Sequence, residues 1–368
     1  MIAHLTTVHA RIDSRIRFRE VNSASRLMSE EVRLYVQDGK GDEIDATGFY
    51  RVVDTGPPLR RLLRMSIGGW RIMRALLRDR PRIAHFHDPE LIPWALILQW
   101  FGILVIYDVH EDVPRQMRHN PRLPKAVRML LPPAVELVEW LAGLLLSGIV
   151  VTTPTIGRRF ADRKTILIRN FPILDEMVNK SWVPMTERAP KFAYVGTILG
   201  NRGLFTMLDA LTGQDGFCTS LALAGEFTVE SEKAKAEQHS NWHKVYDLGW
   251  LDRSGVANLL GNVRAGLVTL HPTAHYIDAL PTKLFEYMSA GLPVIASDFP
   301  LWREIVEQAD CGILVDPLVP AEISQAMAWI LDHPTEAEAM GKRGRQAVAD
   351  RYNWRPEAEE LIQFYSRM

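Results

Sequence analysis

The residues best placed to do chemistry lie in one segment of this 368-residue chain, Asp278–Asp298. Pro281 opens a predicted helix, and Lys283 and Glu286 share one face of it because they are three residues apart. A helix N-terminus with a nearby lysine is suited to a diphosphate, and a carboxylate one turn later can accept hydrogen bonds from two ribose hydroxyls. A solvent-exposed ion pair is the commoner fate of a Lys/Glu pair. The position after a strand ending at His271 favours a binding site instead.

A glycine-rich segment, Gly196–Gly203, follows the first predicted strand of the C-terminal half. Glycines allow a backbone to approach a ligand closely, and the charge of Arg202 can neutralise a leaving diphosphate. Taken alone, this segment is only a weak and generic signal of a ligand-binding turn.

Polar loops also follow predicted strands in the N-terminal half. Four residues of the first loop are candidate contacts to an anion or a sugar: His9, Arg11, Asp13 and Arg15. A solvated polar loop is a nearly equal interpretation. Two later strands end in His85-Phe-His87-Asp-Pro-Glu90 and Tyr107-Asp-Val-His110-Glu-Asp112. Their spacing fits no common zinc pattern, and the sequence contains no Asp-x-Asp, so no metal site is predicted.

These loops require a scaffold that gathers strand ends at one edge. In both halves, short apolar runs alternate with helical patterns, which predicts an α/β fold with parallel sheets and helices on both faces. Ligands of such sheets bind at the carboxyl ends of the strands. We expect one domain over residues 1–178, a polar linker over 179–190 and a second domain over 191–350. A final helix over 351–368 is expected to cross back to the first domain.

The overall composition is that of a globular protein, with 47% hydrophobic and 24% charged residues. Residues 1–180 carry 27 Lys/Arg and 20 Asp/Glu, whereas the rest is acidic, which suggests domains with different partners. Cys218 and Cys311 form no paired motif, so a disulfide scaffold is not expected and a reducing compartment is. Neither a targeting signal nor a membrane span is predicted, because prolines and glutamates interrupt the longest apolar stretch, 130–151. This stretch is expected to form a packed helix that runs into a buried strand.

The segment 278–298 closely resembles the donor-binding signature of family 4 retaining glycosyltransferases. That family has the GT-B fold, two Rossmann-like domains facing each other across a cleft. Its two acidic signature residues, separated by seven positions, correspond to Asp278 and Glu286. Further segments agree in order and spacing: Tyr194-Val-Gly-Thr, Leu223-Ala-Gly-Glu, Leu248-Gly-Trp-Leu, Gly312-Ile-Leu-Val-Asp-Pro and Tyr352-Asn-Trp354. The resemblance covers essentially the whole C-terminal half.

The resemblance implies a role for each matching residue. Glu286 would hold the nucleotide ribose, and Asp278 would contact the donor sugar with backbone amides around Tyr276 and Ile277. The loop with Gly196 and Thr197 would adjoin the donor, with Arg202 and Lys283 stabilising its diphosphate. His110 matches the family's cleft histidine, which faces donor sugar and acceptor. Three residues depart from the family pattern: Asp278 replaces a usual Glu, Thr197 a usual Arg and Arg202 a usual Lys.

The resemblance also implies a reaction. We expect a retaining, metal-independent hexosyltransferase without a cofactor, which takes a nucleotide-sugar donor (UDP-sugar favoured) and reacts by front-face substitution. The acceptor would be a glycan or a lipid-diphosphate-linked glycan in cell-surface polysaccharide synthesis. Two alternatives stay open: a non-catalytic, membrane-associated GT-B partner, and a GT-B nucleotide-sugar epimerase, against which the Asp278/Glu286 signature argues.

Basic residues in the N-terminal half raise the question of a membrane surface. A helix is predicted over 59–77. Five arginines within it or just beyond it form one stripe opposite an apolar one: Arg60, Arg64, Arg71, Arg74 and Arg78. A second basic cluster follows at Arg115, Arg118, Arg122, Lys125 and Arg128. An anionic membrane and plain solvation of these residues are equally good interpretations. A cytoplasmic protein, peripheral on the inner face of the plasma membrane, is therefore one expectation; nucleic acid is not an expected partner, because no binding motif accompanies the arginines.

Overall fold

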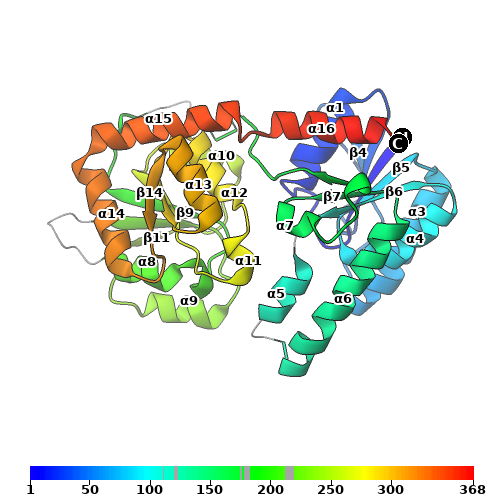
Figure 1. The fold of residues 1–368 in the computed structure, drawn as a ribbon, viewed down its shortest axis with the longest axis horizontal. Coiled ribbons are helices and arrows are strands. Elements are labelled where there is room, and N and C mark those ends of the chain that lie inside the picture. Colours follow the sequence, from blue (N-terminus) through cyan, green and yellow to red (C-terminus); the bar gives the residue numbers. More distant parts are fainter. Residues whose placement is uncertain (111, 120–122, 175, 178–182, 212–218) are drawn as a thin grey trace. The chain divides into compact units, whose positions relative to one another are not determined.

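The structure is a computed structural model that describes residues 1–368 except 111, 120–122, 175, 178–182 and 212–218 (Figure 1). Two compact units make up the chain: unit 1 is residues 1–170 with 354–368, and unit 2 is residues 171–353. The division falls at Asn170, before the linker predicted from the polar stretch. Residues 179–182 of that linker, and Arg122 and Cys218, lie outside the described residues.

Among the residues described, unit 1 contains an eight-stranded sheet with the order β3-β4-β2-β1-β5-β6-β7-β8. Its strands are β1 (Ile2–Leu5), β2 (Val32–Val36), β3 (Glu43–Ile44), β4 (Tyr50–Asp54), β5 (Ile83–Phe86), β6 (Leu104–Val109), β7 (Gly148–Val151) and β8 (Thr165–Leu167). The short edge strand β3 pairs antiparallel with β4, and the other pairings are parallel. The central strands are largely apolar because helices cover both faces of a parallel sheet, although β1 and β5 each contain a buried histidine.

The helices of unit 1 include two π-helical segments. Its helical elements are η1 (π, Ile16–Val21), α1 (Asn22–Leu27), α2 (Arg61–Leu63), η2 (π, Arg64–Gly68), α3 (Gly69–Asp79), η3 (Pro89–Leu91), α4 (Ile92–Trp100), α5 (Val113–His119), α6 (Lys125–Leu145), α7 (Pro154–Gly157), η4 (Asp162–Lys164) and α16 (Trp354–Ser366). The single helix predicted over 59–77 is interrupted by η2, whose Met65 carbonyl accepts a hydrogen bond from Trp94 Nε1 at 2.7 Å. An inserted partner of this kind explains the local change of helical period.

Within the described residues, unit 2 is a second α/β body with a six-stranded sheet in the order β11-β10-β9-β12-β13-β14. Its strands are β9 (Lys191–Val195), β10 (Ser220–Ala224), β11 (Val245–Asp247), β12 (Ala265–Val268), β13 (Val294–Ser297) and β14 (Gly312–Val315), and all pair in parallel. Its helical elements are η5 (Met185–Glu187), η6 (Gly200–Arg202), α8 (Leu204–Ala210), α9 (Glu230–Glu237), η7 (Trp242–Lys244), α10 (Arg253–Leu260), α11 (Ala274–Ile277), α12 (Thr282–Ser289), α13 (Pro300–Ala309), α14 (Pro320–Asp332) and α15 (Pro334–Asp350). The predicted α/β class with two parallel sheets is confirmed.

The C-terminal helix α16 belongs to unit 1 although it follows unit 2 in the sequence. Trp354 Nε1 donates a hydrogen bond to Ser23 Oγ at 2.8 Å, and Glu357 accepts one from the Arg169 amide at 2.6 Å. Near the other end of α16, Tyr365 is fully buried. The helix therefore completes the core of unit 1.

Neither a disulfide scaffold nor a membrane span is expected from the sequence. Cys311 is a buried, free cysteine. No helix in the described ranges combines the length and the hydropathy that crossing a bilayer requires. The apolar stretch from residue 130, however, is not packed as expected: α6 exposes a row of large apolar side chains, including Leu130, Leu137 and Trp140.

Candidate functional site

The side chain of Lys283 is buried at the start of α12 in unit 2. Only 8% of the residue is exposed, and its Nζ has no hydrogen-bond partner among the described residues. Nζ lies 3.4 Å from the centroid of the Tyr194 ring, a cation–π contact that replaces part of its lost hydration. Burial, and then the charge of Arg202, lowers the pKa of Lys283 well below the usual lysine value. An anion bound here would supply the acceptors that the ammonium group lacks.

The loop after β9 brings its backbone close to this lysine. Gly196 has φ of +114°, and a Cβ at this position would lie 3.4 Å from Lys283 Nζ. Gly203 has φ of +88°, and a Cβ there would come within 2.2 Å of the Thr269 carbonyl oxygen. Both positions therefore require glycine, the first beside the ammonium group and the second where α8 begins.

Arg202 lies just before Gly203 and is held by α11. Its Nε donates a hydrogen bond to the Tyr276 hydroxyl at 3.0 Å. Because the charge of Arg202 also lowers the pKa of Lys283, the two side chains lie close enough to interact electrostatically. Two cations brought together in a largely buried place, with Gly196 beside them, are chemically suited to a multiply charged anion.

Glu286, one turn after Lys283, is held by a residue that the sequence did not reveal. Arg253 Nη1 donates to Glu286 Oε1 at 2.6 Å, and Arg253 Nε donates to Glu176 Oε1 at 2.8 Å. Arg253 begins α10, whose preceding residue Asp252 caps the helix by accepting from the Gly255 amide at 2.7 Å. The cap fixes the start of α10, and the arginine then fixes the carboxylate of Glu286.

The other predicted donor-side residues lie on neighbouring backbone. Tyr276 and Ile277 end α11, and Asp278 directly follows them. The next carbonyl, Ala279 O, accepts a hydrogen bond from Trp302 Nε1 at 2.7 Å, which anchors the turn into α12. Thr197 is fixed through its carbonyl, which accepts from the Tyr194 hydroxyl at 2.9 Å.

In unit 1, a buried ion pair organises the strand ends. Arg15 Nε and Nη2 donate to the two oxygens of Asp108 at 2.9 and 2.8 Å. Asp108 Oδ2 also lies 2.9 Å from His87 Nδ1 and 3.1 Å from His110 Nδ1. Burial alone would raise the pKa of Asp108, but Arg15 and the two histidines hold it well below its usual value. The carboxylate therefore stays ionised and orients His110.

The loop after β1 uses most of its predicted contact residues internally. Arg11 pairs with Asp38 at 2.6 Å, and Asp13 accepts hydrogen bonds from the amides of Arg15 and Ile16 at 2.8 and 2.9 Å. The side chains of His9 and His110 remain 22% and 13% exposed. Their ring centroids are 4.9 Å apart.

His9 also lies near a second carboxylate of unit 1, that of Asp88. His9 Nε2 lies 3.4 Å from Asp88 Oδ1, and Asp88 Oδ2 accepts from the Thr7 amide at 2.6 Å. Of the predicted unit 1 residues, His9 and His110 thus present imidazoles to solvent, whereas the charges of Arg11 and Arg15 are neutralised by carboxylates of the same unit.

Residues 180–347, most of unit 2, match the family model for glycosyl transferases group 1. The C-terminal part of the chain thus resembles the group 1 glycosyltransferases. The chain is 28% identical to the D-rhamnosyltransferase WbpZ of Pseudomonas aeruginosa over 152 residues, 41% of this chain and 38% of that protein. The alignment thus spans well under half of that relative.

Solved structures extend the likeness to both units. Sucrose-phosphate synthase from Thermosynechococcus elongatus has a TM-score of 0.79 at 18% identity, over 100% of this chain and 98% of that one. Anabaena HepE in complex with UDP-glucose has a TM-score of 0.75 at 11% identity, over 100% and 99%. The GT-B fold and the resemblance to family 4 are thereby confirmed.

The structure places the predicted unit 2 residues on three adjacent segments. Lys283, Arg202 and Gly196 are brought together around one buried position, with Glu286 on the next turn of α12. Three residues that position them received no role from the sequence: Tyr194, Glu176 and Arg253. Tyr194 lies in a segment that resembles the family, which was an available signal. Arg253, which pairs with Glu286, and Glu176, which pairs with Arg253, have no such signal in the local sequence.

We expect Arg253→Met to destabilise the protein by about 1–3 kcal/mol, because it leaves the carboxylate of Glu286 buried without its partner. Urea unfolding followed by circular dichroism measures this loss. The matched control is Arg355→Met, whose ion pair with Glu359 is exposed and should change stability by less than about 0.5 kcal/mol. Equal effects of the two substitutions would contradict a positioning role for Arg253.

Proposed function

We propose that unit 2 binds a nucleotide-diphosphate sugar, with UDP-sugar favoured, and that the chain transfers the sugar with retention to a glycan or lipid-linked acceptor of cell-surface polysaccharide synthesis. The observation that carries the proposal is the buried, unpartnered ammonium group of Lys283 beside Gly196 and Arg202. A diphosphate has the charge and the acceptors that this position lacks. The complex of the structural neighbour HepE with UDP-glucose supports the choice of donor.

In the proposed reaction, the bond between the anomeric carbon and the diphosphate oxygen breaks, and a bond from that carbon to the acceptor oxygen forms on the same face. The acceptor hydroxyl proton passes to the leaving diphosphate. Lys283 and Arg202 would stabilise the charge that develops on that diphosphate, so this role needs no metal ion or cofactor. Positioning and charge stabilisation would supply most of the rate enhancement.

The remaining donor-side residues would orient the nucleotide sugar. Glu286, held by Arg253, would accept hydrogen bonds from the ribose hydroxyls. Asp278, at the end of α11, would contact the sugar together with the backbone at Tyr276 and Ile277. Thr197, whose side chain carries no charge, leaves stabilisation of the diphosphate to the two cations.

The donor site is tested by thermal unfolding with UDP, GDP, ADP and CMP, each with and without EDTA. Since a ligand that binds only the native state raises its stability by mass action, we expect an upward shift in Tm with UDP that survives EDTA. Glu286→Ala and Lys283→Met should abolish the shift. A chain that responds to none of the four nucleotides would overturn the proposed donor site and favour the non-catalytic alternative.

The Lys283 variant carries its own control for misfolding. Because Lys283→Met removes a buried charge, it should raise the Tm of the free protein while it removes the UDP response. Lys342→Met, at a largely exposed lysine, should change neither.

Affinity for UDP should also depend on pH in a defined direction. In the free protein the pKa of Lys283 lies below the usual lysine value, and a bound diphosphate would raise it again. Binding above the free-protein pKa therefore takes up a proton, so affinity should fall with rising pH, by at most about tenfold per pH unit.

Isothermal titration above about pH 7, where the terminal phosphate is ionised, measures this dependence. Lys283→Met should bind weakly with no such slope. A wild-type affinity that stays constant up to the usual lysine pKa would contradict the proposed contact.

We further propose that unit 1 associates peripherally with an anionic membrane surface on the cytoplasmic face, where a lipid-linked acceptor would lie. Along α6, large apolar side chains are exposed at Met129, Leu130, Leu137, Trp140, Leu141, Leu144 and Leu145. A second exposed apolar group lies over α2, η2 and α3, at Leu62, Met65, Ile67 and Trp70. Lys125 is exposed near the first group, and Arg60 and Arg61 near the second. Apolar side chains beside basic ones suit an anionic bilayer, at about 1 kcal/mol per basic residue.

Co-sedimentation with liposomes tests the membrane proposal. We expect binding to vesicles that contain anionic lipid and much less to neutral ones, with Trp140→Ser weakening it several-fold. Trp250→Ser is the matched control, since Trp250 is also exposed but belongs to unit 2. Equal binding to both vesicle types, or equal loss in both variants, would contradict the proposed surface.

A further inference from the structure

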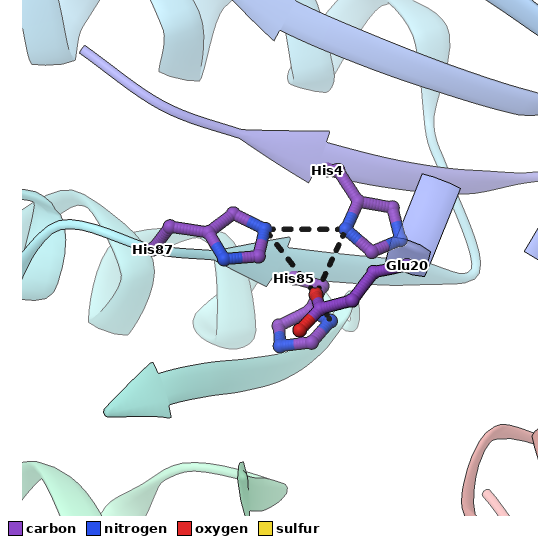
Figure 2. A group of neighbouring side chains, drawn as sticks. All are labelled: His4, Glu20, His85 and His87. Carbon is purple, nitrogen blue, oxygen red and sulfur yellow. Dashed lines mark hydrogen bonds and ion pairs between the residues drawn. The ribbon is translucent and has the colours of Figure 1, made fainter. Parts of the chain in front are cut away.

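Three histidines and a glutamate meet at a buried point of unit 1, on one face of its sheet (Figure 2). In the parallel pairing of β1 with β5, His4 stands opposite His85. His87 follows His85 by two residues, so strand alternation places it on the same face. Glu20, on the π-helical segment η1, reaches this face from above the sheet. The four residues are 0–2% exposed.

Glu20 is poorly compensated for a buried carboxylate. Neither of its oxygens has a hydrogen-bond partner in the part of the chain that the structure describes. Arg15 Nε lies 3.0 Å from Oε1 without hydrogen-bond geometry, because Arg15 aims its donors at Asp108. His85 Nε2 is also without a partner among these residues. Groups buried in this way are costly unless something else satisfies them.

The separations between the facing atoms are those of metal ligands. His4 Nδ1 and His87 Nε2 are 3.2 Å apart, and Glu20 Oε2 lies 3.7 and 3.8 Å from them. A point equidistant from three atoms so spaced lies about 2.1 Å from each, which is the usual Zn–N and Zn–O bond length. His85 Nδ1 lies 3.8 Å from Glu20 Oε2 and completes a set whose members are all within 4.8 Å of one another.

The opposite sides of the rings are also occupied in the way that metal-bound histidines require. His87 Nδ1 lies 2.9 Å from the carboxylate of Asp108, and His4 Nε2 lies 3.4 Å from the Tyr365 hydroxyl. Such outer partners fix the tautomer that leaves the facing nitrogen free to bind a cation. His85 Nδ1 lies 2.6 Å from the Tyr365 hydroxyl, so it would exchange this contact for the cation, or its ring would turn to present Nε2.

We propose that His4, Glu20, His85 and His87 bind one divalent transition-metal ion, for which Zn²⁺ is the best match. Three imidazole nitrogens and one carboxylate oxygen form a ligand set that zinc accepts in tetrahedral geometry. The site is structural, because its ligands are closed off from solvent and leave no position for a substrate. It joins β1, β5 and η1, and through them it holds the loop that carries His9 and Arg15. Spacing along the sequence did not predict it, because the ligands come from three separate segments.

The test measures metal directly on full-length protein produced without a histidine tag. Mass spectrometry should find about one zinc per chain in the wild type and much less in Glu20→Gln and in His87→Asn. The control is His239→Gln: His239 pairs with Asp209 at 3.0 Å in unit 2 and should not affect zinc content. Equal loss in the control would identify the metal as adventitious and overturn the proposal.

A second measurement does not depend on the folding of any variant. Wild-type protein stripped with a chelator should regain thermal stability with Zn²⁺, since binding to the native state alone stabilises it. With Co²⁺ it should develop the strong visible absorption of a four-coordinate ion. Stripped protein that takes up neither ion would overturn the site, and the four residues would then be a buried hydrogen-bonded cluster. Nucleotide binding to unit 2 is measured separately, so the two proposals fail independently.

Discussion

A lysine ammonium group held out of water without a hydrogen-bond acceptor destabilises the protein that contains it, and the arrangement around Lys283 offsets this cost only in part. The ring of Tyr194 lies against Lys283 and offsets part of it. The absence of a side chain at Gly196 leaves space beside Nζ. Arg202, fixed to Tyr276, adds a second positive charge rather than a negative one. Such a site is preorganised for an anion, because the folded protein already holds the two cations close together before the anion binds.

In unit 1, by contrast, buried cations are paired with carboxylates. Arg15 is matched by Asp108, and Arg11 by Asp38, so the cations of the first loop are neutralised within the unit. The imidazoles of His9, after β1, and His110, after β6, are partly exposed and lie beside carboxylates. Neutral or singly charged donors and acceptors suit hydroxyl groups better than phosphates. The two units thus differ in the chemistry of the groups that suit them, and the net charge of each half does not reveal this difference, because the more acidic half holds the two cations.

Much of this architecture could be predicted from periodicity. The alternation of short strands and helices in both halves was predicted, because apolar runs and amphipathic spacing are local properties. The prediction of a single helix over 59–77 was wrong at η2. The hydrogen bond that accompanies the change of helical period there comes from Trp94 on α4, which the local sequence does not reveal. In the site, Lys283 and Glu286 could be found because they share a helix face. Arg253 and Glu176 could not, since only the fold brings residues 176, 253 and 286 together.

The place of α16 has a consequence for how the chain is made. Unit 2 is continuous in sequence, whereas unit 1 needs residues 354–368 to close its core around Tyr365. During synthesis, the ribosome therefore releases every residue of unit 2 before it releases the last helix of unit 1. The sheet of unit 1 therefore stays partly uncovered while some 180 further residues emerge. Unit 1 can complete its fold only after unit 2 has been synthesised, and a chaperone would bind the apolar surface that unit 1 exposes during that interval.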